Sequence, residues 1–169
     1  MLSVTMQEAL NAQVTAELYS SYFYLSMSSY CESVSLAGCA GWMRAQAQEE
    51  LYHGMKLYDY INERGGRAIM AAIDQPPSDW DSVQSVFDDV LAHEQKVTGL
   101  INNLMNLAQD ERDHATSSFL RWFIDEQVEE EASVGSVVDK LKMIGKDGNG
   151  LFVLDRELGQ RVFTPPVKE

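Results

Sequence analysis

Glu50 and His53 are the two residues of this sequence whose types and spacing best suit metal chemistry. They belong to the run Glu49-Glu50-Leu51-Tyr52-His53, inside a segment (residues 36–64) that has the pattern of a long helix. Residues three apart share one face of a helix, so a carboxylate oxygen and an imidazole nitrogen can bind the same metal ion. The apolar residues around the pair follow a spacing of three and four, which directs both side chains toward the core. Burying an unpaired charge costs on the order of several kcal/mol, so the sequence predicts partners elsewhere in the chain.

Three other predicted helices each carry an acid in the apolar stripe that should face the core. The clearest stripe runs through residues 82–108, where Glu94 is the one polar member. On a single helix, a solvated face explains such an acid equally well, because glutamate is common on helices. On four helices together, the coincidence favours a shared site. The inward polar residues outside the first pair are Glu17, Glu94, Gln127 and Glu130.

This set of donors is hard and anionic, because it consists mainly of carboxylates with one imidazole. Such a set suits iron or manganese and tolerates zinc. Four or five carboxylates balance two divalent ions, and a bridging acid such as Glu50 would hold the ions close together, so the sequence predicts a di-iron centre. Tyr24, on the same predicted face as Glu17, would hydrogen-bond a ligand or supply an electron. An ordinary core tyrosine explains this position equally well.

A second group of acids adjoins the first. Glu126, Glu129 and Glu130 share a helical face through their spacing of three and four, and Glu49 neighbours Glu50. These acids form either a third metal site beside the di-iron centre or a solvated acidic run that includes the next residue, Glu131.

Two histidines and two cysteines lie outside these groups. His93 and His114 are off the predicted stripes, so we expect both at the surface. Cys31 and Cys39 are too few for a disulfide scaffold and match no zinc pattern, so we expect two buried thiols.

The hydropathy pattern predicts an all-α fold, an antiparallel four-helix bundle with a short fifth helix at the C-terminus, in a single domain over residues 1–169. We expect the first and third helices to be parallel. The connection between the second and third helices, residues 65–81, contains two prolines and is too long for a tight turn. At roughly 3.3 Å per residue it can run the length of a long helix, which predicts a crossover. The predicted helices are residues 5–32, 36–64, 82–108, 113–144 and 150–158.

Some helix ends also carry sequence signals. Thr5-Met6-Gln7-Glu8 has the form of a capping box, and Ser35 is expected to cap the second helix. Residues 164–169 are expected to be a frayed tail. Asp110, Glu111 and Asp113 precede the fourth helix, where acids either line a cation channel or are favoured by the helix macrodipole.

Composition narrows the classes of partner. The 26 acidic and 13 basic side chains give a formal net charge of −13, which makes a nucleic acid or an anionic membrane an unsuitable partner and favours cations. No apolar run approaches the roughly 18 residues of a membrane span, and the N-terminus does not resemble a signal peptide. The sequence therefore predicts a cytoplasmic protein.

Taken together, these residues resemble the non-haem bacterial ferritins of the ferritin-like di-iron superfamily. The resemblance covers almost the whole chain. The sequence differs from the rubrerythrin, bacterioferritin and ribonucleotide-reductase branches of this superfamily. Those branches have two E-x-x-H pairs, whereas this sequence has one and carries Gln127-x-x-Glu130 in place of the second. Leu51 stands where bacterioferritins have a haem-ligating methionine, so haem is not expected. The residues that carry the resemblance are Glu17, Tyr24, Glu49-Glu50-Leu51-Tyr52-His53, Glu94 and Glu126-Gln127-Val128-Glu129-Glu130.

The resemblance implies a hollow homo-oligomeric shell of 24 subunits that oxidises Fe(II) with O2 or H2O2 and stores a ferric oxide mineral. It implies that Glu17, Glu50 and His53 bind a first iron. Glu50 would bridge to a second iron held by Glu94 and Glu130, with Gln127 close by and Tyr24 as a reductant or hydrogen-bond donor. The third site would consist of Glu49, Glu126, Glu129 and Glu130.

Two alternatives to an iron-storage ferroxidase remain at this point. One is a non-storage di-iron redox enzyme that acts on peroxide or an organic substrate, as rubrerythrins do. The other is a structural ferritin subunit with an idle centre.

Overall fold

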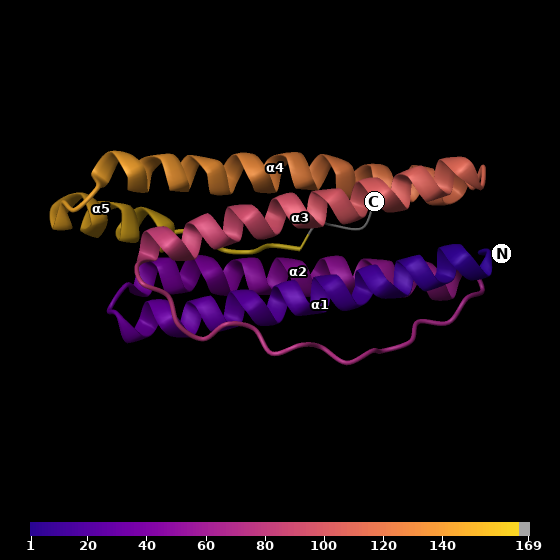
Figure 1. The fold of residues 1–169 in the computed structure, drawn as a ribbon, viewed down its shortest axis with the longest axis horizontal. Helices are drawn as coiled ribbons and strands as arrows, with labels where there is room; N and C mark the ends of the chain where they lie inside the picture. The colour runs from indigo at the N-terminus through magenta and orange to yellow at the C-terminus, as the bar shows by residue number, and fades with distance from the viewer. Residues whose placement is uncertain (166–169) are drawn as a thin grey trace.

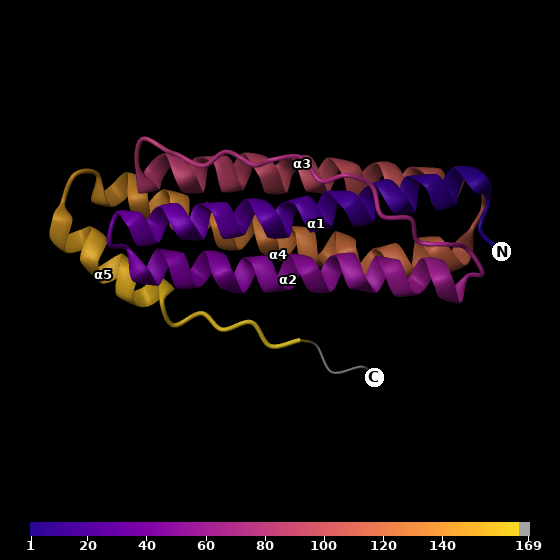
Figure 2. The ribbon, with the colours of Figure 1, turned by 90° about the horizontal axis from the view of Figure 1, so that it is seen from below.

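The computed structural model describes residues 1–165, and these residues form five helices and no strand (Figure 1). Four long helices lie side by side, and a short fifth helix packs across one end of them (Figures 1 and 2). The predicted four-helix bundle, its crossover and its short fifth helix are therefore confirmed. Residues 166–169, the last part of the predicted frayed tail, lie outside the described residues. The helices are α1 (Val4–Ser33), α2 (Ala37–Glu63), α3 (Val83–Asp110), α4 (His114–Ile144) and α5 (Gly148–Leu158).

The crossover, residues 64–82, runs back along the whole bundle beside α1 (Figure 1). Asn11 of α1 holds its first part, because its side chain donates to the carbonyl of Arg67 (3.1 Å) and accepts from the amide of Ile69 (2.7 Å). Since the crossover returns the chain to the end where α2 began, α3 runs parallel to α2 and antiparallel to α1 (Figure 1). The predicted parallel arrangement of the first and third helices is wrong for this reason.

The first three helices end in the same hydrogen-bonded turn. After α1, Ser35 has a φ of 63°, and the amide of Leu36 donates to the carbonyl of Cys31. Gly65 and Arg112 take the same position after α2 and α3, with φ angles of 74° and 55°. This pattern is the Schellman motif, in which a left-handed residue reverses the chain and satisfies the last carbonyls of the helix. Ser35 therefore closes α1 rather than capping α2 as predicted.

Side chains that accept hydrogen bonds fix several helix starts. Ser3 caps α1 by accepting from the amide of Met6 at 2.9 Å, so the predicted capping box at Thr5–Glu8 is wrong: Thr5 already lies inside the helix. Asp113 caps α4 by accepting from the amide of Thr116 (3.1 Å) and forms an ion pair with Arg64 (3.1 Å). Asp113 thus caps α4 and links it to the residue that follows α2.

Two apolar clusters fill the core, one toward each end of the bundle. The cluster near α5 contains Phe87 of α3 and Val138 of α4, and the cluster at the other end contains Leu10 of α1 and Ile101 of α3. The inward polar residues of the four long helices come between these clusters. The core is therefore divided by a polar layer near the middle of the bundle, and both cysteines are buried and free in the cluster near α5, as predicted.

α5 is fixed against the start of α2. Asp155 accepts a hydrogen bond from the amide of Cys39 at 2.8 Å, and Leu154 and Leu158 are buried in the adjacent cluster. A Cβ atom at Gly38 would lie 1.7 Å from the carbonyl oxygen of Asp155, so this close approach requires glycine. Within the described residues, no helix is both long enough and apolar enough to cross a membrane.

Candidate metal centre

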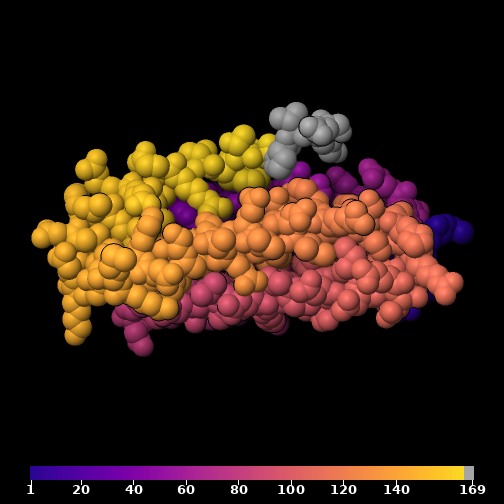
Figure 3. All heavy atoms as spheres, turned by 90° about the horizontal axis from the view of Figure 1, so that it is seen from above, coloured from indigo at the N-terminus to yellow at the C-terminus, as the bar shows by residue number. Residues whose placement is uncertain are grey.

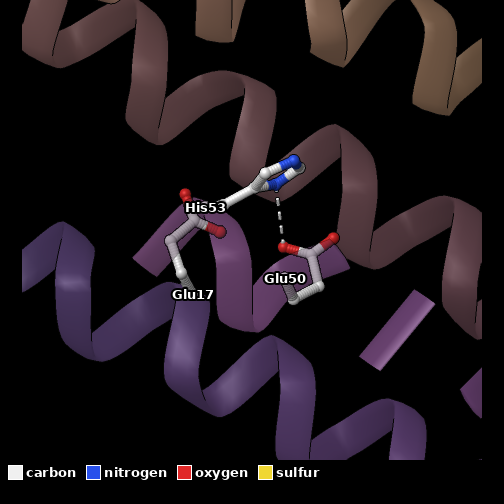
Figure 4. Close-up of side chains that lie close together, drawn as sticks. All are labelled: Glu17, Glu50 and His53. Carbon is white, nitrogen blue, oxygen red and sulfur yellow. Dashed lines mark ion pairs between the residues drawn. The ribbon is translucent and has the colours of Figure 1, made fainter. Parts of the chain in front are cut away.

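Glu17 from α1 and the Glu50–His53 pair from α2 meet inside the polar layer (Figure 4). One ligand atom from each residue lies within 4.8 Å of the others, and the three residues are only 1–2% exposed. His53 turns its Nδ1 toward Oε2 of Glu50 at 3.5 Å, so the E-x-x-H spacing places both groups on one side as predicted. Two antiparallel helices thus bring a carboxylate, a second carboxylate and an imidazole to one point.

Glu17 has an incomplete set of hydrogen bonds. Its Oε1 accepts from Gln13 at 2.9 Å, and its Oε2 finds no partner within the described part of the chain although it is fully buried. Buried polar atoms are nearly always bonded, so an exception calls for a specific explanation. A cation at this oxygen would provide the missing interaction, and the donor set present suits a hard divalent ion.

The other half of the layer comes from α3 and α4. Glu94 accepts hydrogen bonds from the hydroxyl of Tyr24 and from Nε2 of Gln127, the latter at 3.3 Å. Glu130 accepts from Nε2 of Gln46 at 2.8 Å. Both carboxylates are at most 4% exposed, and neutral side chains donate to both oxygens of Glu94 and to one oxygen of Glu130. The layer therefore contains four buried carboxylates with neutral donors around them.

Burial raises the pKa of all four carboxyl groups. Desolvation raises the pKa of Glu17 to about 8, and the neighbouring charge of Glu50 adds to the effect. Desolvation also raises the pKa of Glu130 to about 7, with further increases from the charges of Glu94 and Glu49. The pKa values of Glu50 and Glu94 are raised for the same leading reason. A divalent cation would reverse this electrostatic balance, so its binding would release protons.

The second group of acids is brought together only in part. Glu49 and Glu126 approach His53 so that one atom from each of the three lies within 4.8 Å of the others. Both acids are half-buried, whereas Glu129 is exposed. Glu131 points elsewhere and accepts a hydrogen bond from Thr98 at 2.6 Å. Glu49 and Glu126 thus form a cluster on the outer side of His53.

His93 corrects one prediction. It is half-buried rather than at the surface, with its ring 5.0 Å from that of Phe23 and a 2.8 Å hydrogen bond to Ser20. Burial lowers its pKa to about 4. His93 lies outside the central apolar stripe of α3, on a side where aromatic residues of α1 pack against it, so the stripe did not indicate its burial. His114 is exposed, as predicted.

Three further residues contact the candidate ligands and were not assigned to the site from the sequence. Gln13 and Gln46 lie one helical turn before Glu17 and Glu50, so the same spacing that identified the acids would also have found them. Arg161 follows α5 and forms an ion pair with Glu49 at 2.7 Å, a contact between residues 112 positions apart that no local pattern indicates.

The fold and the site define a four-helix-bundle protein with a carboxylate-rich candidate metal centre between its helices. The ferritin-like domain family model matches residues 7–144 of this chain. The bacterial non-heme ferritin of Staphylococcus aureus (strain MRSA252) is 44% identical over 163 residues, which cover 96% of this chain and 98% of the relative. The chain belongs to the ferritin family, and the predicted resemblance is confirmed.

Solved structures agree with this assignment. An engineered closed form of Archaeoglobus fulgidus ferritin has a TM-score of 0.96 and 51% sequence identity, covering 97% of this chain and 100% of that chain. An open-pore ferritin from the same hyperthermophilic archaeon has a TM-score of 0.94 and 50% identity, covering 95% of this chain and 99% of that chain.

Proposed function

We propose that this protein is an iron-storage ferroxidase, which oxidises Fe(II) at a two-iron centre inside each subunit and stores the product as ferric mineral in a homo-oligomeric shell. The observation that carries the proposal is the buried, unbonded Oε2 of Glu17, a residue that lies together with Glu50 and His53 in a layer of four carboxylates. The names of the ferritin relatives support the iron-storage part, and "non-heme" in those names supports a site without haem.

In this proposal iron is the substrate. Glu17, Glu50 and His53 bind one Fe(II), and Glu50 bridges to a second Fe(II) held by Glu94 and Glu130. Each Fe(II) gives up one electron, so a pair supplies the two electrons that reduce O2 to peroxide or peroxide to water, with two protons taken up in either case. The four carboxyl groups, whose pKa values are raised by burial, release their protons as the cations bind.

Neutral donors set the position of the second pair of ligands. Gln127 and Tyr24 each donate to Glu94, and Gln46 donates to Glu130. Such contacts orient ligand carboxylates, and removing them typically weakens metal binding about 10- to 100-fold. We assign Tyr24 and Gln127 this orienting role, and we retain electron donation as a second role to be tested for Tyr24.

A third iron site is part of the proposal. Glu49 and Glu126 converge beside His53, and Glu130 lies on the same helix as Glu126. Glu129 is exposed, so its side chain is free to turn toward this cluster when a cation binds. The third site would receive iron next to the two-iron centre.

Aerobic addition of Fe(II) to the metal-free protein tests the proposal. The first two ions per subunit should be oxidised rapidly, and several hundred should then form a soluble mineral inside a shell of 24 subunits. Glu50→Ala should abolish the rapid phase, whereas the exposed Glu63→Ala on the same helix should retain it. Rapid oxidation of two ions followed by precipitation would instead indicate the non-storage di-iron enzyme, and no oxidation above the Glu50→Ala variant would indicate an idle structural subunit.

A further inference from the structure

The chain that leaves α5 does not turn away from the bundle. Residues 159–163, which we call the C-terminal arm, run back along α2 (Figure 2), on the face that also presents α4 (Figure 3). α5 directs this course, because its end packs closely on the start of α2: a Cβ atom at Gly159 would lie 3.1 Å from Cα of Gly38. The arm therefore starts from a fixed point and approaches α2 in a defined direction.

Two side chains attach the arm to α2. The guanidinium of Arg161 lies 4.8 Å from the ring centre of Trp42 and donates to Oε2 of Glu49 at 2.7 Å. Farther along, the ring of Phe163 packs against that of Tyr52, with centres 6.1 Å apart. Trp42, Glu49 and Tyr52 are seven and three residues apart, so they form one face of α2. The contact of Arg161 with Trp42 and the contact of Phe163 with Tyr52 thus hold the arm against α2, before and after Glu49 along the helix.

Glu49 has two possible uses, and they compete with one another. One of its oxygens lies within 4.8 Å of ligand atoms from His53 and Glu126, in the cluster proposed as the third iron site. Its Oε2 is engaged by Arg161, and the side chains of this ion pair are 18% and 24% exposed. A divalent cation and a guanidinium compete for the same carboxylate, because each neutralises its charge.

We propose that Arg161 is the resident counter-ion of the third cation site, and that a divalent cation bound by Glu49 and Glu126 displaces it and releases the C-terminal arm. The proposal rests on the proposed function for the identity of the natural cation, but its geometry stands on Arg161, Glu49 and Trp42 alone. Occupancy of the site and docking of the arm are then linked: each weakens the other by the same factor. Arg161 acts through Glu49, so it is a positioning residue and not an iron ligand.

The linkage gives a functional consequence. With the arm docked, Arg161 keeps Glu49 neutralised and lowers the affinity of the third site, so cations fill the buried two-ion centre first. Once the third site fills, the arm detaches from Trp42 and the guanidinium leaves the cluster. The guanidinium of Arg161, which would repel a cation that enters or leaves the third site, is therefore absent while that site is occupied.

Equilibrium titration of the metal-free, assembled protein with Zn²⁺ tests the proposal without any redox step. The third binding step is identified as the one that Glu126→Gln removes. In Arg161→Ala this step should tighten about 2- to 5-fold, the factor expected for a partly exposed ion pair, while the first two steps stay unchanged. Arg156→Ala, which removes an exposed arginine of α5, is the matched control and should titrate like the unmodified protein.

Hydrogen exchange of the arm provides a readout that a merely structural role would not change. In the unmodified protein, filling the third site should speed amide exchange at residues 159–161, whose amides donate to carbonyls at the end of α5 and lose this protection when the arm detaches. In Arg161→Ala, exchange should be fast already and Zn²⁺ should add little. An unchanged or weaker third step in Arg161→Ala, an arm whose exchange ignores Zn²⁺, or the lack of a third step in the unmodified protein would each overturn the proposal. Because Zn²⁺ is not oxidised, a failure of ferroxidase activity would leave these results interpretable.

Discussion

Gln46 on α2 donates a 2.8 Å hydrogen bond to Oε2 of Glu130 on α4 and so joins the two helices across the polar layer. The other end of the same amide, Oε1 of Gln46, is buried and finds no partner within the described residues. Leaving an acceptor unbonded costs about 1–3 kcal/mol, so the amide is not placed there for its own stability. Its evident effect is to fix the position of a candidate ligand.

The first prediction follows from this contact. Gln46→Leu keeps the approximate volume and removes the donor, so Glu130 loses its positioning and binding of the second Zn²⁺ should weaken about 10-fold. Binding of the first Zn²⁺ at Glu17, Glu50 and His53 should not change. Calorimetric titration distinguishes the steps, and Gln48→Leu, an exposed glutamine on the same helix, serves as the control. Equal affinities in both variants would show that Glu130 is held by packing alone.

Two glycines of α2 should respond in opposite directions to the same substitution. Gly38→Ala places a Cβ atom 1.7 Å from the carbonyl oxygen of Asp155, so α5 has to shift and unfolding should become easier by about 3 kcal/mol or more. Gly41→Ala meets no atom within 4 Å and should stabilise the helix by about 0.5–1 kcal/mol. Denaturant unfolding of the metal-free protein measures both. Similar values for the two variants would mean that α5 is not docked through Gly38 in solution.

Apolar periodicity was sufficient to predict the four long helices and the inward acids, because burial of one face dominates the energetics of a long amphipathic helix. Glu94 is the clearest case, since it interrupts an otherwise regular apolar stripe. The direction of α3 could have been derived from the same pattern. A crossover that spans the bundle returns the chain to its starting end, so α3 has to run against α1.

Other features left no local signal. Ser35 has the side chain of a cap, yet its backbone adopts the left-handed conformation that ends α1, because the chain must reverse within a few residues. His93 is half-buried against aromatic residues of α1, and Arg161 contacts Glu49 although 112 positions separate the two residues. Contacts of this kind depend on how helices are docked, which the hydropathy of a single segment does not encode.

The pH dependence of the metal-free protein should depend on Glu17. Its pKa rises from 4.5 to about 8 on folding, so the folded state holds a proton that the unfolded state loses above pH 4.5. The stability from this group is complete below pH 4.5 and is lost as the pH rises toward 8, by at most about 5 kcal/mol at about 1.4 kcal/mol per unit. The unfolding temperature should therefore fall between pH 5 and pH 8.

Glu17→Gln removes the titrating group while keeping the contact with Gln13 possible, so the fall in unfolding temperature should be smaller in this variant. Glu63→Gln replaces an exposed acid on α2 and controls for the loss of one negative charge. Its unfolding temperature should change with pH as steeply as that of the unmodified protein. With Zn²⁺ bound the trend should reverse, because protons compete with the cation at low pH. If the unfolding temperatures of all three metal-free proteins change equally with pH, a group other than Glu17 causes the pH dependence.

Tyr24→Phe separates the two roles considered for Tyr24. The substitution keeps the ring that packs edge-on against Trp42, with centres 6.4 Å apart, and removes the hydroxyl that donates to Glu94. If the hydroxyl orients Glu94, the second Zn²⁺ should bind about 10-fold more weakly, and Fe(II) oxidation should slow only at low Fe(II) concentration. If Tyr24 supplies an electron, Zn²⁺ binding should be unchanged and oxidation should slow even at saturating Fe(II). Tyr22→Phe, a half-exposed tyrosine on the same helix, controls for the loss of a hydroxyl. We expect the first result, because the hydroxyl of Tyr24 already donates to Glu94 in this structure.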